Sequence, residues 1–218
     1  MKTIVKKILG VGGAAVVILA ANAHAEGERA SVSLELPSDF IVKACPAAVW
    51  KGSKLQWKGV VDARTQPEVG GQSKKKGKDP VLVDAAPPLT EVLNDALPTL
   101  FQSCGMKLVD ADTSLPATRR SLRLVEEGRP DVTLSAEIKE FYAGVEKGLF
   151  TGKGMARSAL LFHVTKKNDT TERTVEVGYE MESKKIRQKD IRQLESTLNE
   201  LLARTLEQVP KLDGFKDF

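Results

Sequence analysis

The sequence has few of the residues that usually carry chemistry. Its 218 residues include two histidines and two cysteines, and aromatic residues make up 5%. A zinc site needs several histidine or cysteine ligands at workable spacing, so this small set makes a poor candidate. The 17 glycines and 10 prolines exclude a collagen-like chain, and two cysteines exclude a disulfide-dense one. A hydrophobic fraction of 41% is ample for a core and excludes wholesale disorder.

Short catalytic and cofactor motifs are also missing. No Gly-x-Ser-x-Gly elbow occurs to pair with His163. The stretch 71–78 fails as a phosphate-binding loop because its glycines lie one residue too far apart and Asp79 stands where that loop has Ser or Thr. Gly152-Lys153-Gly154 has Arg157 in place of the third glycine of a dinucleotide motif. We therefore expect no catalytic, cofactor-binding or metal-ligating residues, and a protein that is not an enzyme.

The first 25 residues have the pattern of a secretory signal peptide. Three lysines precede an uncharged apolar run from Ile8 to Ala21, and Ala23-His24-Ala25 places small residues at both positions that signal peptidase recognises. The run is shorter than the roughly 18 to 20 apolar residues that span a membrane, and an uncleaved anchor is the alternative. We predict cleavage after Ala25 and export to the periplasm, with association to the outer membrane as a further expectation.

Cleavage would remove most of the apparent basicity. The formal charge of +4 includes three lysines of the signal, which contains no acid, so the mature chain keeps 30 basic and 29 acidic residues. Phosphate binding needs clustered surplus positive charge. We therefore expect no nucleic-acid partner.

Alternation of apolar and polar residues predicts strands in several segments. These are Ala30–Leu36, Leu55–Arg64, the short Met106–Val109, Asp131–Tyr142, Arg157–Lys166 and Thr174–Glu182. The last three are expected to form an antiparallel meander, with Gly144–Gly154 as a longer glycine-rich connection and Lys167-Asn168-Asp169 as a turn. The stretch 66–88 is rich in glycine, proline and lysine, which predicts a long exposed loop.

Two segments have helical periodicity. Leu89–Cys104 and Lys189–Val209 repeat apolar residues at three- and four-residue steps, and Gly105 is the expected cap of the first helix. Pro98 removes a backbone donor, so we expect a kink or break near Asp95. The residues 40–54 and 110–129 give no clear pattern.

These elements predict an α/β (α+β) fold of the two-layer sandwich type. We expect a largely antiparallel sheet of about four to five strands, with the two amphipathic helices on one face. The domain organisation follows as a signal peptide at 1–25, an N-terminal strand and irregular segment at 26–54, and a single sandwich domain at 55–215.

Cys45 and Cys104 form an even pair in a chain predicted to reach an oxidising compartment. We predict a disulfide between them, and two buried thiols are the alternative. A redox role is not expected without a Cys-x-x-Cys spacing.

The one local cluster of positive charge in the mature chain is Lys74, Lys75, Lys76 and Lys78. A solvated loop is the plain interpretation, and contact with anionic lipid, lipopolysaccharide or peptidoglycan is the functional one. Ser73 and Lys76 also have the Ser-x-x-Lys spacing of penicillin-recognising enzymes, although a flexible loop gives them no fixed geometry.

Two further groups have a structural and a functional interpretation. His163 lies within a predicted strand, where a histidine with satisfied hydrogen bonds is expected rather than a general base or pH sensor. Asp62 and Arg64 flank the end of a predicted strand, and we favour a structural joint over a site.

Several of these segments together resemble the YajG-like family of bacterial lipoproteins, whose function is uncharacterised. The matching residues are Gly59-Val60-Val61-Asp62-Ala63-Arg64, Gly70-Gly71, Leu89–Phe101 with Cys104-Gly105-Met106, Asp131–Phe141, Gly148–Gly154, and Leu198–Val209 with Leu212. The resemblance covers roughly Leu55 to Phe215. It implies a non-enzymatic component of the envelope, near the outer membrane, with no catalytic residues to carry over.

The sequence departs from this family in two places. Members usually have a lipidated cysteine directly after the signal, whereas Glu26 follows Ala25 here. We therefore expect soluble periplasmic residence rather than a lipid anchor. The stretch 110–129 is also longer than the family pattern.

Three functional hypotheses follow. The leading one is an exported accessory protein that binds another envelope protein through a sheet edge or the glycine-rich loops. The second is an auxiliary periplasmic component of an ABC-type lipid or solute transporter, a family of similar size and element order. The third is a Ser-Lys acyl hydrolase that uses Ser73 and Lys76.

Overall fold

The computed structural model describes residues 28–45, 49–50, 52–72, 81–109, 125–126, 129–147, 152–167, 171–183 and 191–211. The predicted signal peptide, the four lysines at 74–78 with Ser73, the turn residues 168–169 and most of 110–129 lie outside the described residues.

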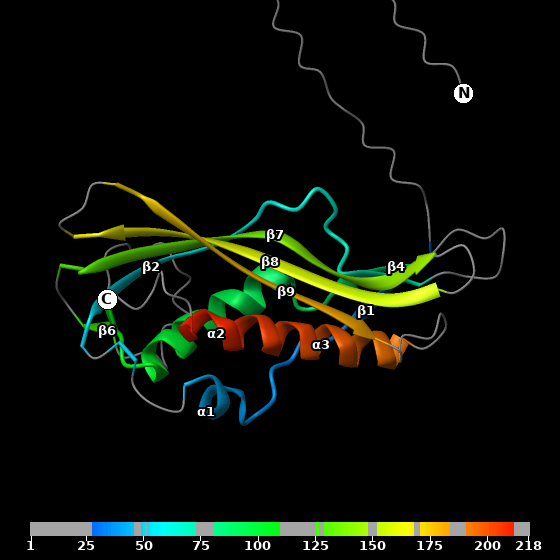
Figure 1. Ribbon diagram of the computed structural model, residues 1–218, viewed down its shortest axis with the longest axis horizontal. Coiled ribbons are helices and arrows are strands. Elements are labelled where there is room, and N and C mark those ends of the chain that lie inside the picture. Colours follow the sequence, from blue (N-terminus) through cyan, green and yellow to red (C-terminus); the bar gives the residue numbers. More distant parts are fainter. Residues whose placement is uncertain are drawn as a thin grey trace, which may run out of the picture.

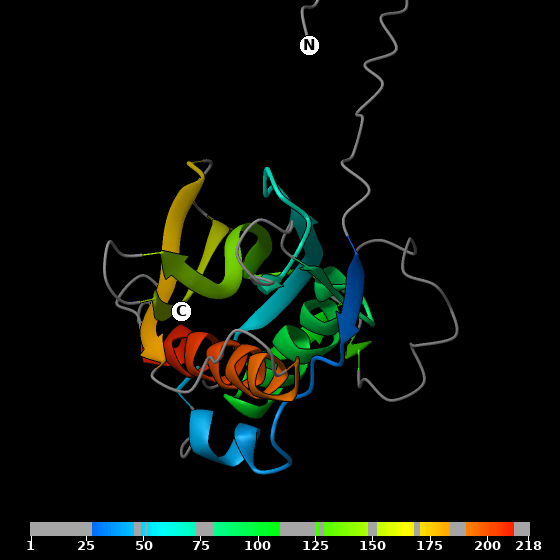
Figure 2. The same ribbon diagram turned by 90° about the vertical axis from the view of Figure 1, so that its right-hand side faces the viewer.

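Within the described residues the strands form one mixed sheet of nine strands. These are β1 (Arg29–Val32), β2 (Lys54–Asp62), β3 (Gly70–Gln72), β4 (Val81–Ala85), β5 (Lys107–Val109), β6 (Val125–Glu126), β7 (Val132–Lys147), β8 (Gly152–Lys166) and β9 (Arg173–Ser183). Their order is β1-β4-β3-β7-β2-β5-β6. Off this path, β8 pairs with β7, and β9 pairs with β8. Strands β1 and β9 thus lie at opposite sides of the sheet (Figure 2).

The three longest strands confirm the predicted antiparallel meander. Residues alternate between buried and partly exposed along β7 and β8, as the period of two requires. The expected connection at Gly144–Gly154 is shorter than predicted, because β7 continues to Lys147 and pairs it with Gly152 of β8. The glycines extend the hairpin instead of interrupting it.

The sheet is larger and less antiparallel than the sequence predicts. Strand β2 runs parallel to β7, with Leu55 opposite Val132, and it also runs parallel to β5. The chain between β2 and β7 contains a helix, and a crossover of this kind returns the chain in the same direction. A register shift between Trp57 and Val60 bulges β2 at Gly59, whose φ of 101° favours glycine.

The prediction of a loop over 66–88 is wrong for part of that stretch. It contains β3 and β4, which pair antiparallel, and Val69, Gly70 and Val83 are buried. Gly70 is required by close approach, since a Cβ there would lie 2.8 Å from the carbonyl oxygen of Ala143 on β7. Composition indicated a loop because the stretch is rich in glycine. Composition alone does not show that these glycines allow two strands to come together.

Helices cover one face of the sheet, as predicted (Figure 1). They are α1 (Phe40–Ala44), α2 (Leu89–Ser103) and α3 (Ile191–Gln208), followed by a 3₁₀ turn at Val209–Lys211. The helix α2 runs unbroken through Pro98, so the expected break is absent, and Gly105 follows it with φ 102°. No helix of the described segments is long and apolar enough to cross a membrane.

The core lies between the sheet and the apolar stripes of α2 and α3. Its centre is Phe101 of α2, whose ring centroid lies 5.8 Å from that of Trp50, 5.7 Å from Trp57 and 6.4 Å from Phe162. Aromatic pairs at such separations add to the free energy gained by burial. The prediction that each helix buries one apolar face is thereby confirmed, because the repeated leucines of both helices are buried.

The segment after β1 is fastened to α3. The backbone N–H of Ser33 donates to Glu195 Oε2 at 3.1 Å, and the N–H of Glu35 donates to Asn199 Oδ1 at 3.0 Å. Asn199 Nδ2 also donates to the carbonyl oxygen of Ser33. These side chains provide the partners that a neighbouring strand would give, so the chain can pass over a helix without leaving amides unsatisfied.

Candidate functional site

Strand β9 presents a long free edge. Among the described residues its backbone pairs only with β8, over a register that runs from Gly154 opposite Ser183 to Val164 opposite Arg173. Val175, Val177, Tyr179 and Met181 face the core. An edge of this length offers a row of backbone donors and acceptors to another strand.

The direction of the edge amides follows from one contact. The Ser158 hydroxyl donates to the Tyr179 carbonyl oxygen at 3.3 Å, so this carbonyl faces β8. Successive residues of a strand turn their backbone groups to opposite edges. The amides of Gly178 and Glu180 therefore point away from β8, toward the free edge.

The open face of this strand is acidic. Glu176 and Glu180 are exposed there, opposite Leu161 and Arg157 of β8. Arg157 Nε lies 3.4 Å from Glu180 Oε1 with both side chains largely exposed. Such a pair contributes little to stability, so both groups can exchange partners at low cost.

Asp62 and Arg64 form a two-pronged ion pair at the end of β2. The Arg64 side chain is 6% exposed. Its Nε donates to Asp62 Oδ1 at 2.9 Å and its Nη2 to Asp62 Oδ2 at 2.7 Å, while the remaining N–H groups donate to the carbonyl oxygens of Pro67, Glu68 and Phe141. All five donors of the guanidinium are thus in use. The arrangement ties the end of β2 to the next loop and to β7, which is a structural role.

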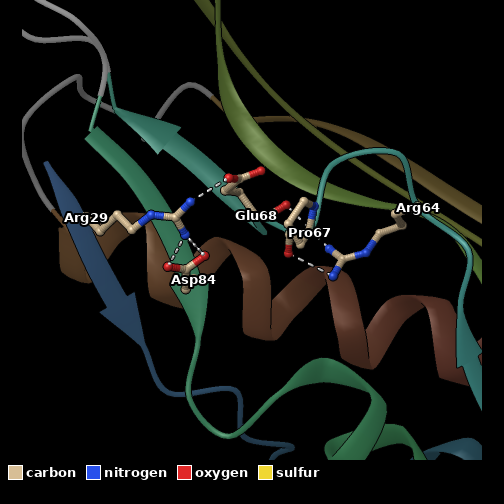
Figure 3. A network of polar contacts seen from close by, with 5 residues as sticks. All are labelled: Arg29, Arg64, Pro67, Glu68 and Asp84. Atoms are coloured by element: carbon tan, nitrogen blue, oxygen red, sulfur yellow. Dashed lines mark hydrogen bonds and ion pairs between the residues drawn. The ribbon is translucent and has the colours of Figure 1, made fainter. Parts of the chain in front are cut away.

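The same loop connects to the other edge of the sheet (Figure 3). Arg29 of β1 lies 2.9 Å from Asp84 of β4 and 3.3 Å from Glu68. Glu68 therefore connects β1 to the loop that follows β2. Its backbone carbonyl accepts a hydrogen bond from Arg64, and its carboxylate pairs with Arg29. Sequence analysis missed this network, because residues 39 and 55 positions apart give no local signal.

The Asp62–Arg64 pair predicts a defined acid dependence of stability. Hydrogen bonds from Arg64 hold the pKa of Asp62 below its ordinary value of 3.8, against a smaller opposing effect of burial. A carboxyl whose pKa is depressed on folding stabilises the protein above its unfolded pKa, and this contribution disappears as the pH falls through the folded pKa. In urea unfolding, the difference in free energy between the wild type and Asp62→Asn should be constant above about pH 5 and shrink below about pH 4. A constant difference down to about pH 2.5 would contradict this.

Tyr142 lies beside this network. It lines a cavity of about 310 Å³ together with Arg64, Gln66 and Lys139. Burial, with a further contribution from the Glu68 carboxylate, raises the pKa of Tyr142. A phenol with a raised pKa stays protonated near neutral pH, so the group is not prepared to act as a base or nucleophile.

His163 lies between two glutamates on the open face of the sheet. Its Nδ1 is 2.7 Å from Glu172 Oε1, and its Nε2 faces Glu137 Oε1 at 3.3 Å without a hydrogen bond. Ser135 is the residue opposite His163 on β7, yet Nε2 bonds to no hydroxyl of the described segments. A nucleophile–base pair is therefore not formed at this position.

The structure joins Cys45 and Cys104 by a disulfide, with Cα atoms 5.3 Å apart. Cys104 is fully buried behind α2, and Cys45 follows α1. In addition, the backbone N–H of Trp50 donates to the backbone carbonyl oxygen of Cys104 at 2.9 Å. Both cysteines of the sequence are therefore used to hold the N-terminal segment against α2.

The remaining predicted site residues cannot be placed in this arrangement. Ser73, Lys74, Lys75, Lys76 and Lys78 lie outside the described residues. No group of three or more metal-ligating side chains occurs in the part of the chain that the structure describes.

One comparison supports the predicted membership of a lipoprotein family, without distinguishing the YajG-like family from others. A family model described as "Uncharacterized lipoprotein" matches residues 52–211. A search of curated proteins finds no match.

Solved structures with related architecture are distant. Protein XCC0632 from Xanthomonas campestris has 13% identity and a TM-score of 0.47, covering 84% of this chain and 90% of that one. The hypothetical protein CT253 from Chlamydia trachomatis has 9% identity and a TM-score of 0.40 over 72% and 93%. Lipoprotein GNA1162 from Neisseria meningitidis has 8% identity and a TM-score of 0.36 over 73% and 99%. These values are too low for any of the three to guide a functional assignment.

Proposed function

We propose a binding role for this chain, which belongs to the family described as uncharacterized lipoproteins. In this proposal the protein is an exported, non-enzymatic accessory component of the cell envelope. It acts by accepting a strand of another envelope protein at the free edge of β9.

The observation that carries this proposal is the length and orientation of that edge. Eleven residues from Arg173 to Ser183 pair on one side only within the described segments, and the amides of Gly178 and Glu180 point outward. Strand addition derives its affinity from such backbone groups and its specificity from alternate side chains.

The charges of the edge favour a different protein over a second copy. If two copies paired antiparallel about Gly178, Glu176 of each would lie opposite Glu180 of the other. Pairing about Tyr179 would place Glu176 opposite Glu182. Like charges directly opposite each other destabilise a strand pair. A partner strand with lysine or arginine on this face would instead be attracted.

The test uses two substitutions at one position. Glu180→Pro removes an outward amide, and Glu180→Ala removes the same carboxylate but keeps the amide. Proline is tolerated at an edge whose N–H faces solvent, so both variants should retain the melting temperature of the wild type within a few degrees. Tagged protein is purified from gently solubilised envelopes, and the co-purifying proteins are identified by mass spectrometry.

The expected result is a stoichiometric envelope partner that Glu180→Ala retains and Glu180→Pro loses. A transporter subunit with this behaviour would assign the protein to the transport complex that the sequence suggested as an alternative. Retention of the partner by Glu180→Pro, or its loss from both folded variants, would contradict strand addition. A serine adduct at Ser73 would revive the hydrolase hypothesis.

A further inference from the structure

The core-facing side of β9 is incompletely covered. In the neighbouring strand β8, every second residue from Gly154 to Val164 is buried. The residues of β9 that lie beside them and face the same layer are Val175, Val177, Tyr179 and Met181, and of these four only Val177 is buried. The apolar layer thus extends to the edge of the sheet, where three of its side chains stay partly in water. Covering them would be favourable in proportion to the apolar area buried.

The backbone of β9 determines how closely an added strand approaches these side chains. Because the carbonyl oxygen of Tyr179 faces β8, the core-facing residues use their backbone groups within the sheet. An antiparallel neighbour on the free edge would meet them in non-hydrogen-bonded pairs, whose Cα atoms lie about 4.5 Å apart rather than about 5.5 Å. Side chains contact more closely in such pairs. Apolar residues of a partner therefore gain most at these positions.

The opposite face of the same edge has a gap between two carboxylates. Gly178 is exposed there without a side chain, and Glu176 and Glu180 flank it on the same face. Glu180 lies near the exposed Arg157, whereas Glu176 makes no ion pair among the described residues. A partner side chain opposite Gly178 would have room to lie across the glycine. Diagonal neighbours two residues away are within reach of a long side chain, so a basic residue there could contact Glu176.

We infer that the strand accepted at β9 is antiparallel, carries arginine or lysine opposite Gly178, and has apolar residues directly before and after that position. This inference rests on the proposed strand addition and names the sequence pattern of the partner. The apolar residues complete the layer that is unfinished at Val175 and Tyr179, while the basic residue lies between the two carboxylates. A wholly polar strand would leave the apolar layer exposed. A strand with an acidic residue opposite Gly178 would be repelled by the carboxylates.

The test compares three fluorescein-labelled peptides of seven residues by fluorescence anisotropy. In the first, valine occupies the odd positions, arginine the central position, and threonine the remaining two. The second has glutamate in place of the arginine, and the third has serine in place of every valine. The wild-type protein should bind the first peptide about tenfold more tightly than either of the others, because each loses favourable cross-strand pairs.

A charge reversal on the protein gives the sharpest variant. Glu176→Lys should reverse the preference, so that the glutamate peptide binds more tightly than the arginine peptide. Glu200→Lys is the matched control, because it makes the same change at an exposed position of α3, beside α1. The control should keep the wild-type preference. Both positions are exposed, so both variants should retain the melting temperature of the wild type within a few degrees.

Several results would overturn the inference. These are equal affinity of the wild type for the three peptides, no binding of the arginine peptide, an unchanged preference in Glu176→Lys, and a reversed preference in the control. Glu180→Pro separates this inference from the strand addition on which it rests, since it should bind none of the peptides. Loss of binding in Glu180→Pro with equal affinities in the wild type would overturn the sequence pattern alone. Unchanged binding by Glu180→Pro would contradict strand addition itself.

Discussion

Replacing Arg64 with methionine should lower the free energy of unfolding by about 2 to 3 kcal/mol, because the acceptors that the buried guanidinium serves lose their donors while the Asp62 carboxylate stays partly exposed to water. The methionine can fill much of the space of the arginine side chain. It removes the two guanidinium donors of the Asp62 carboxylate, which keeps the backbone N–H of residue 64, and it removes the donors that face Pro67 and Phe141. The loss should be visible in urea unfolding as a lower midpoint with little change in slope.

Two further substitutions separate geometry from charge. Arg64→Lys keeps the charge but offers three donors on one atom, which cannot reproduce the planar, two-pronged contact with Asp62. We expect it to recover only part of the lost stability. Arg157→Ala removes the exposed partner of Glu180 and should cost less than about 1 kcal/mol. If Arg64→Met costs no more than Arg157→Ala, the network does not have the structural role assigned to it.

The helices and the meander were predictable because their signal is local and repeated. Leu93, Leu97 and Leu100 of α2 recur with the helical period, and all three are buried. The alternation of Val132, Leu134 and Ala136 in β7 likewise matches one face of a strand. Each pattern is present over enough residues to outweigh a single contrary residue such as Pro98.

The short strands were not predictable in this way. Gly70 and Gly71 belong to a strand because β3 comes close to β7, and this requirement is visible only once Ala143 is placed beside them. The parallel pairing of β2 with β7 was missed for a related reason. Alternation reveals a buried face, but it is the same for a parallel and an antiparallel neighbour.

The candidate binding edge depends on tertiary placement even more strongly. The sequence predicts β9 as a strand, whereas its position at the end of the sheet follows from pairing order. The helix α1 was also missed, because sequence patterns left its segment ambiguous where Cys45-Pro46 interrupts it.

Removing the disulfide should have the second large effect on stability. The bond closes a separation of 59 residues, which corresponds to about 4 kcal/mol in the chain-entropy description. The double variant Cys45→Ser and Cys104→Ala should therefore unfold at a clearly lower urea concentration. The bond joins the residue that ends α1 to the residue that ends α2, so its loss should also weaken the packing of α1 against the core.

A control of similar cost distinguishes loss of the bond from loss of core packing. Leu160 is 1% exposed in the centre of β8, and Leu160→Ala should lower stability by about 2 to 5 kcal/mol without touching α1 or the disulfide. A reducing agent should lower the urea midpoint of the wild type and of Leu160→Ala, and it should leave the midpoint of the cysteine variant unchanged. If the wild-type midpoint does not fall on reduction, the hydrogen bonds of residues 50–53 with 104–107 hold this segment without the disulfide.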